Sequence, residues 1–145
     1  MIEHVSHIGV WVLDQDQALD FYVNKLGFKV HTDAKTDGFR WLTITPPDQP
    51  DLQIMLSVPG TPTHDEESAT QLKELLAKGA LGGGILGTKD CRATYKELVA
   101  RGVEFTQEPT DTFYGVDAAF RDPFGNQWRL VQQLPNPPRE FPKDF

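Results

Sequence analysis

The chain has 145 residues, 39% of them hydrophobic and 10% aromatic, and its formal net charge is −7 at pH 7. This balance favours one globular domain, or two small packed halves, over a disordered chain. The acidic charge argues against nucleic acid or an anionic membrane surface as the main partner. A single cysteine, Cys91, the lack of a long apolar run and the lack of a leader peptide favour a cytoplasmic protein.

The first sixty residues predict the element order β-α-β-β-β. Residues 3–13 alternate as a strand, which places His7 and Trp11 on one face. Asp14 or Asp16 is expected to cap the following helix, and Gly27 suits the position that ends it. Further strands are expected over residues 28–31, 39–44 and 52–58.

A connector follows, from residue 59 to residue 84. Acidic residues at 65–67 predict the first turn of a helix that Gly79 ends, because carboxylates suit the positive end of a helix dipole. The run Gly82–Gly84 lacks the spacing of a phosphate-binding loop, so it is interpreted as a flexible hinge.

The second half repeats the first. When Ala18 is set against Ala93, Gly27 falls on Gly102 at the same offset. A strand at 85–88, a helix over about 90–100 and strands near residues 103, 117 and 128 again give β-α-β-β-β. Residues 135–145 form a proline-rich tail that is expected to be extended.

The stretch 120–134, FRDPFGNQWRLVQQL, predicts two strands joined by a tight turn. Its pattern D-P-x-G-N-x-W-x-L-V, together with the repeat, resembles the vicinal oxygen chelate superfamily of glyoxalase I, bleomycin-resistance proteins and extradiol dioxygenases. The resemblance implies an α+β fold, in which two tandem βαβββ modules form a half-barrel sheet around a cavity. Within a single domain of residues 1–145, module 1 is expected over about 1–60, a connector helix over about 61–81, module 2 over about 82–134, and the tail over 135–145.

The resemblance also implies four metal-ligand positions, which fall on His7, Gln53, the stretch Gly82–Gly84 and Arg129. Of these, only His7 is a strong ligand, since the amide of Gln53 is neutral, glycine has no side chain and Arg129 is a permanent cation. The two-histidine, one-carboxylate set of an iron dioxygenase is missing as well. We therefore expect no metal and no other cofactor.

Arg129 has two interpretations. It alternates with Trp128 and Leu130, so it points to the opposite face, where its guanidinium can bind an anionic ligand oxygen; the repeat is taken to pair it there with Gln53. Alternatively, it forms an ion pair with an acid such as Asp117 or Glu104. His7 likewise either contacts a ligand or is a satisfied core histidine. The predicted ligand-binding residues are His7, Trp11, Trp41, Gln53, Tyr114 and Arg129, whereas His4, His31 and His64 are not assigned to the site.

The resemblance favours a bleomycin-resistance-like protein that binds a small organic molecule in a metal-free cavity and serves resistance or sequestration. The alternative is a glyoxalase- or epimerase-like lyase or isomerase. Such an enzyme requires a rebuilt metal site, or metal-free chemistry with His7 as the base and Arg129 stabilising an oxyanion. Catalytic activity is left open. A homodimer is expected, because half-barrel sheets leave exposed edges.

Overall fold

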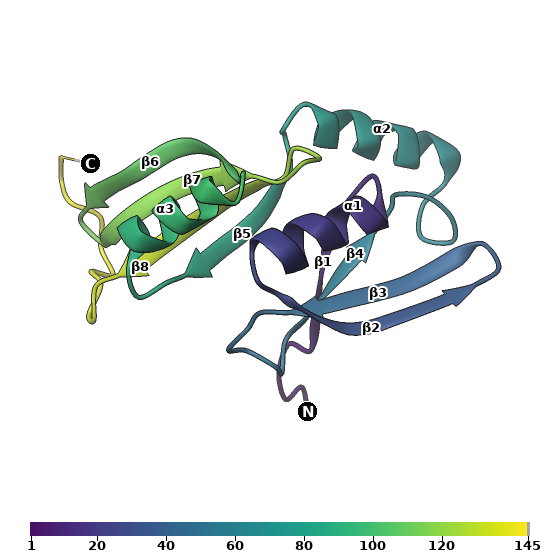
Figure 1. The fold of residues 1–145 in the computed structure, drawn as a ribbon, viewed down its shortest axis with the longest axis horizontal. Helices are drawn as coiled ribbons and strands as arrows, with labels where there is room; N and C mark the ends of the chain where they lie inside the picture. The colour runs from purple at the N-terminus through teal and green to yellow at the C-terminus, as the bar shows by residue number, and fades with distance from the viewer. Residues whose placement is uncertain (145) are drawn as a thin grey trace. The chain divides into compact units, whose positions relative to one another are not determined.

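Each half of the chain folds around its own four-stranded sheet (Figure 1). The structure is a computed structural model and describes residues 1–144. Residues 1–81 with 123–125 form one compact unit, and residues 82–122 with 126–144 form the other. None of the helices in residues 1–144 is long and apolar enough to cross a bilayer.

Module 1 has the strand order β1-β4-β3-β2. Its elements are β1 (His7–Trp11), α1 (Gln15–Leu19), the π-helical turn η1 (Asp20–Lys25), β2 (Lys29–Thr36), β3 (Phe39–Thr45) and β4 (Gln53–Ser57). β1 runs parallel to β4, with His7 opposite Gln53, and the other pairs are antiparallel. Asp14, not Asp16, is the N-cap, because its carboxylate accepts a hydrogen bond from the Gln17 amide. Gly27 has a φ of 84°, a conformation that glycine adopts without strain.

The connector contains the predicted helix, α2 (Glu66–Ala77). The Asp65 carboxylate caps it by accepting the Ser68 amide, and Gly79 ends it with a φ of 73°.

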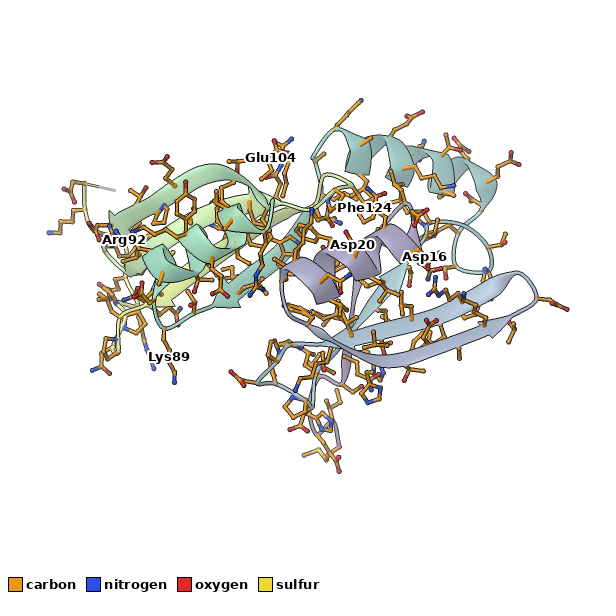
Figure 2. The ribbon with its side chains drawn as sticks, viewed as in Figure 1. Asp16, Asp20, Lys89, Arg92, Glu104 and Phe124 are labelled. Carbon is orange, nitrogen blue, oxygen red and sulfur yellow. The ribbon has the colours of Figure 1, made fainter. Side chains whose placement is uncertain are left out.

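Module 2 repeats the topology, with the order β5-β8-β7-β6 and β5 parallel to β8. Its elements are β5 (Gly82–Gly87), α3 (Cys91–Ala100), β6 (Glu104–Thr112), β7 (Gly115–Arg121) and β8 (Gln127–Gln133). The predicted α+β fold with tandem βαβββ modules is therefore confirmed. Charged side chains such as Arg92 and Glu104 lie on the surface of this module (Figure 2).

In both modules, alternate strand residues are buried on the side of the sheet that the helix covers. The buried strand residues of module 1 include Val10, Leu42, Ile44, Ile54 and Leu56, and those of module 2 include Ala118, Phe120, Trp128 and Leu130. Helix α3 contacts three strands of its sheet, β6, β7 and β8. The residues between the buried ones point to the other side, which we call the open face of each module.

The structure changes several predicted boundaries; β2, for example, continues to Thr36 instead of ending at residue 31. β1 begins at His7 instead of residue 3, because its partner β4 begins at Gln53 and offers no strand beyond it. The run Gly82–Gly84 is the start of β5 and not a separate hinge. A Cβ atom on Gly83 would lie 2.1 Å from a ring carbon of Trp128, so glycine is required for the indole to pack against this strand.

The predicted turn at residues 122–126 is present. The buried Asp122 carboxylate accepts hydrogen bonds from the backbone N–H of Asn126 at 2.9 Å and from its side-chain amide at 2.7 Å. This pair closes the hairpin and fixes the register of β7 against β8, which brings Ala119 opposite Arg129.

Candidate functional site

The open face of module 1 carries aromatic side chains from two strands. Trp11 ends β1 and Trp41 lies in β3, while Met55 comes from β4 between the buried Ile54 and Leu56. Strand alternation accounts for this arrangement, because residues two apart share a face. The sequence predicts both tryptophans for the site. Met55 was missed, although its alternation with the apolar Ile54 and Leu56 can be read from the sequence.

A cavity of about 400 Å³ lies on this face. Its walls include Trp11, Phe39, Trp41, Met55 and Ser57, and the segment after β4 contributes further residues, Pro59, Gly60 and Thr61. Gln15 and Arg40 line it as well, so the aromatic and aliphatic walls are combined with a few polar groups and one cation. Mainly apolar cavities of this size with a few polar groups are typical of small-molecule sites.

His7 and Gln53 lie on the same face but do not line this cavity. The Nδ1 atom of His7 is 2.9 Å from Ser6 Oγ, and its ring packs against Trp41 with ring centroids 6.0 Å apart. The side-chain oxygen of Gln53 accepts a hydrogen bond from the buried Thr43 hydroxyl at 2.9 Å. Both side chains support the wall beside the tryptophans.

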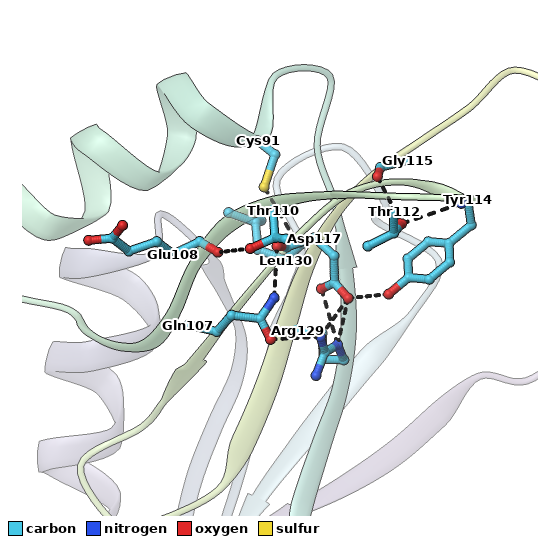
Figure 3. Close-up of polar contacts among 10 residues, drawn as sticks. All are labelled: Cys91, Gln107, Glu108, Thr110, Thr112, Tyr114, Gly115, Asp117, Arg129 and Leu130. Atoms are coloured by element: carbon cyan, nitrogen blue, oxygen red, sulfur yellow. Dashed lines mark hydrogen bonds and ion pairs between the residues drawn. The ribbon is translucent and has the colours of Figure 1, made fainter. Parts of the chain in front are cut away.

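The open face of module 2 carries a polar cluster centred on Asp117 (Figure 3). Arg129 Nε donates to both carboxylate oxygens at 3.1 Å, and its Nη2 donates to Oδ2 at 2.5 Å. The Tyr114 hydroxyl also donates to Oδ2. Gln107 joins the cluster, because its side-chain amide donates to the Asp117 backbone carbonyl at 3.1 Å and its oxygen accepts from Arg129 at 3.3 Å.

Burial differs sharply within this ion pair. The Asp117 side chain is 1% exposed, whereas that of Arg129 is 44% exposed. The hydrogen bond to Asp117 raises the pKa of the Arg129 guanidinium, and the same carboxylate raises the pKa of the Tyr114 phenol. Both groups thus keep their protons at neutral pH.

The repeat therefore gives the two open faces opposite chemistry. When the buried residues Leu56 of β4 and Leu130 of β8 are taken as equivalent positions of the repeat, Arg129 corresponds to Met55. The pairing of Arg129 with Gln53 that was expected from the sequence is therefore wrong. Asp117 corresponds to Trp41 in the same way. The bulge between Gly82 and Gly84 and the different loop lengths hid this register from sequence reasoning. Module 2 thus holds an ion pair where module 1 holds a tryptophan and a methionine.

The residues at the implied metal positions do not fit a transition metal. In neither module do three or more His, Cys, Asp or Glu side chains of residues 1–144 gather as a ligand set. The one buried carboxylate of the polar cluster, Asp117, already faces the Arg129 cation, which would repel a dication.

Two further titratable side chains, Cys91 and His64, lie outside the polar cluster. Cys91 is fully buried, and its thiol lies 3.5 Å from the Leu130 carbonyl. Burial raises the pKa of this thiol, which disfavours the nucleophilic thiolate.

His64, which the sequence left unassigned, packs against Trp11 with ring centroids 4.7 Å apart. This contact arises from the path of an irregular segment, for which periodicity gives no signal.

Comparison with known proteins identifies relatives over nearly the whole chain. The sequence model of the family described as Glyoxalase/Bleomycin resistance protein/Dioxygenase superfamily matches residues 4–130. The crystal structure of UcmS2 is similar, with a TM-score of 0.86 and 42% identity over 92% of this chain and 100% of that one. TnmS3, an antibiotic binding protein from Streptomyces sp. CB03234, has a TM-score of 0.72 and 34% identity over 92% and 98%. The uncharacterized protein YurT of Bacillus subtilis is 34% identical over 86% of this chain and 94% of its own length.

Proposed function

Because the chain belongs to the glyoxalase/bleomycin resistance protein/dioxygenase superfamily, we propose that it binds a small, planar, mainly apolar molecule without a metal. The ligand lies against Trp11 and Trp41 in the cavity of module 1. The biological role is resistance or sequestration, in which the protein removes a harmful compound from solution.

The aromatic cavity carries this proposal. Two indoles and the flexible Met55 side chain supply a large apolar contact area, and the thioether adapts to ligands of irregular shape. Ser57, Gln15, Arg40 and the segment after β4 supply the few polar groups that orient a ligand. The likeness to TnmS3 supports the same role, since that protein is described as binding an antibiotic.

Catalysis has less support. The alternative enzyme needs a free base and a free oxyanion-binding cation. However, Arg129 is committed to Asp117 through three hydrogen bonds, and His7 is bonded to Ser6 and packed on Trp41. These contacts stabilise the two faces and favour binding over turnover.

A homodimer is part of the proposal. The edge strands β2 and β6 carry features that disfavour pairing with another chain. β2 has the charged residues Lys29, Asp33 and Lys35, and β6 has acidic residues, a proline and two register shifts. The edges β1 (HIGVW) and β5 (GGGILG) contain no Asp, Glu, Lys, Arg or Pro. Unprotected edges of this kind favour pairing with a further strand, which a second copy of the chain can provide.

The test is a titration with 2-naphthylmethanol, an uncharged planar aromatic, followed by calorimetry and by tryptophan fluorescence. We expect a saturable site whose Kd rises about tenfold to a hundredfold in Trp41→Ala, because the variant loses a large apolar contact. Val30→Ala, an exposed apolar position on β2, is the matched control and should bind as wild type does. Unchanged affinity in both Trp11→Ala and Trp41→Ala would refute the assignment.

A further inference from the structure

The segment from Pro59 to His64 is a thin wall of the aromatic cavity. Pro59, Gly60 and Thr61 line that cavity and also line a second one of about 440 Å³, whose other walls include His64 and residues of α2. Open space on both sides leaves room for Gly60 and Thr61 to move, whereas the Pro59 ring is buried and anchors the start of the segment.

His64 holds this wall in place through three contacts. Its backbone N–H donates to the Gly60 carbonyl at 2.7 Å, and the Gly60 N–H donates back to His64 Nδ1 at 3.3 Å. The half-buried imidazole also meets the Trp11 indole edge to face, at 4.7 Å between centroids and 68° between planes. One side chain therefore ties the wall to the tryptophan that the ligand contacts.

Of these contacts, the hydrogen bond from the Gly60 N–H requires the neutral imidazole. An Nδ1 atom that accepts a hydrogen bond carries no proton, so the ring proton is on Nε2. An imidazolium has N–H groups at both positions, and its Nδ1–H would face the Gly60 N–H. Histidine is the side chain whose charge ordinarily changes between about pH 5 and 8.

The charged groups around His64 favour its departure once it is protonated. Asp65, Glu66 and Lys73 line the same cavity from α2, and the contact from β1 is the uncharged Trp11. The pKa of Asp65 is lowered mainly by the Ser68 hydrogen bonds and in part by His64, so the carboxylate and the imidazole are within electrostatic reach. The two carboxylates attract an imidazolium towards the start of α2, which Lys73 opposes.

We infer that His64 is a positioning residue that gates the aromatic cavity: the neutral side chain holds the 59–64 wall by accepting the Gly60 N–H, and proton uptake breaks this bond. The inference rests on the proposed function, because it takes this cavity as the ligand site. Loss of the Gly60 bond loosens the wall, so a bound ligand leaves faster at acidic pH.

The experiment measures the dissociation rate of 2-naphthylmethanol, which does not titrate in this range, by stopped-flow fluorescence at about pH 7.5 and about pH 5.5. For wild type we expect dissociation to be about threefold to tenfold faster at the lower pH, as the loss of one weak hydrogen bond implies. His64→Asn keeps an acceptor oxygen for the Gly60 amide without titrating, so it should be slow at both pH values. His64→Ala should be fast at both.

His31→Asn is the matched control, since His31 is an exposed histidine on β2, and it should keep the wild-type pH dependence. A pH-independent wild type, or a His64→Asn protein that still responds to pH, would overturn the gate. The Gly60 amide resonance in ligand-free protein is a second readout. It should titrate in wild type and not in His64→Asn, and a Gly60 amide that does not titrate would also overturn the gate. This readout tests the gate separately from the proposed function, which fails on its own if the naphthyl compound does not bind.

Discussion

Asp117 and Arg129 face each other across β7 and β8, with the carboxylate buried and the guanidinium half exposed. The arrangement follows from the hairpin register, in which the small residue Ala119 is opposite Arg129. Asp117 lies two residues before Ala119 on β7, so it shares the same face and is the diagonal neighbour of Arg129. Because the carboxylate is out of water, its charge depends on the arginine and on the Tyr114 hydroxyl for compensation.

Arg129→Met should destabilise the protein. The variant leaves a buried carboxylate with one remaining donor side chain, and we expect a loss of about 1–3 kcal/mol in the free energy of unfolding. Chemical denaturation measures it. The double variant Asp117→Asn/Arg129→Met removes both charges and should recover much of the loss; equal destabilisation in the two proteins would show that packing, not charge, is responsible.

Tyr114→Phe should lower stability at neutral pH by about 1 kcal/mol, because the buried carboxylate loses a hydrogen bond. The folded-state pKa of Tyr114 is raised, chiefly by the hydrogen bond to Asp117. The advantage of wild type is therefore fully present below about pH 10, where the unfolded phenol ionises, and is lost as the pH rises through the higher folded-state pKa. Denaturation curves of both proteins from neutral to alkaline pH test this, and a constant difference would contradict it.

Gly83→Ala should be strongly destabilising, by about 2 kcal/mol or more, because the new Cβ would overlap the Trp128 ring. Gly87→Ala is the control on the same strand, where a Cβ meets nothing within 4 Å. Thermal unfolding should show a clear drop for the first variant and little change for the second. Similar melting temperatures for the two variants would exclude this role for Gly83.

Sedimentation should show a dimer at micromolar concentration. Ile85→Lys introduces a charge on the uncharged β5 edge at a position that is 68% exposed, so it should shift the protein towards monomer without unfolding it. Thr32→Lys, on the already charged β2, should leave the assembly unchanged. A wild-type monomer, or a dimer unaffected by Ile85→Lys, would count against edge pairing.

The fold was predictable because its signals are local and occur twice. Gly27 and Gly102 both follow a helix at the same offset, and the turn at 122–126 announces the last hairpin. The site was predictable in composition but not in geometry. The sequence offered two interpretations of Arg129, and only the pairing of β7 with β8 shows that Asp117 is its partner. His64 reaches the site through an irregular segment whose path depends on tertiary contacts, whereas the alternation that places Met55 on the open face is local and readable from the sequence.

The hydrogen bond from the Gly60 amide to His64 has a thermodynamic consequence for the proposed binding reaction. A ligand that needs the closed wall and a proton that opens it compete for the same side chain, so each weakens the binding of the other by the same factor. Ligand uptake in mildly acidic solution then expels a proton into the buffer. The measured heat of binding should accordingly vary with the ionisation enthalpy of the buffer, and this variation should vanish in His64→Asn.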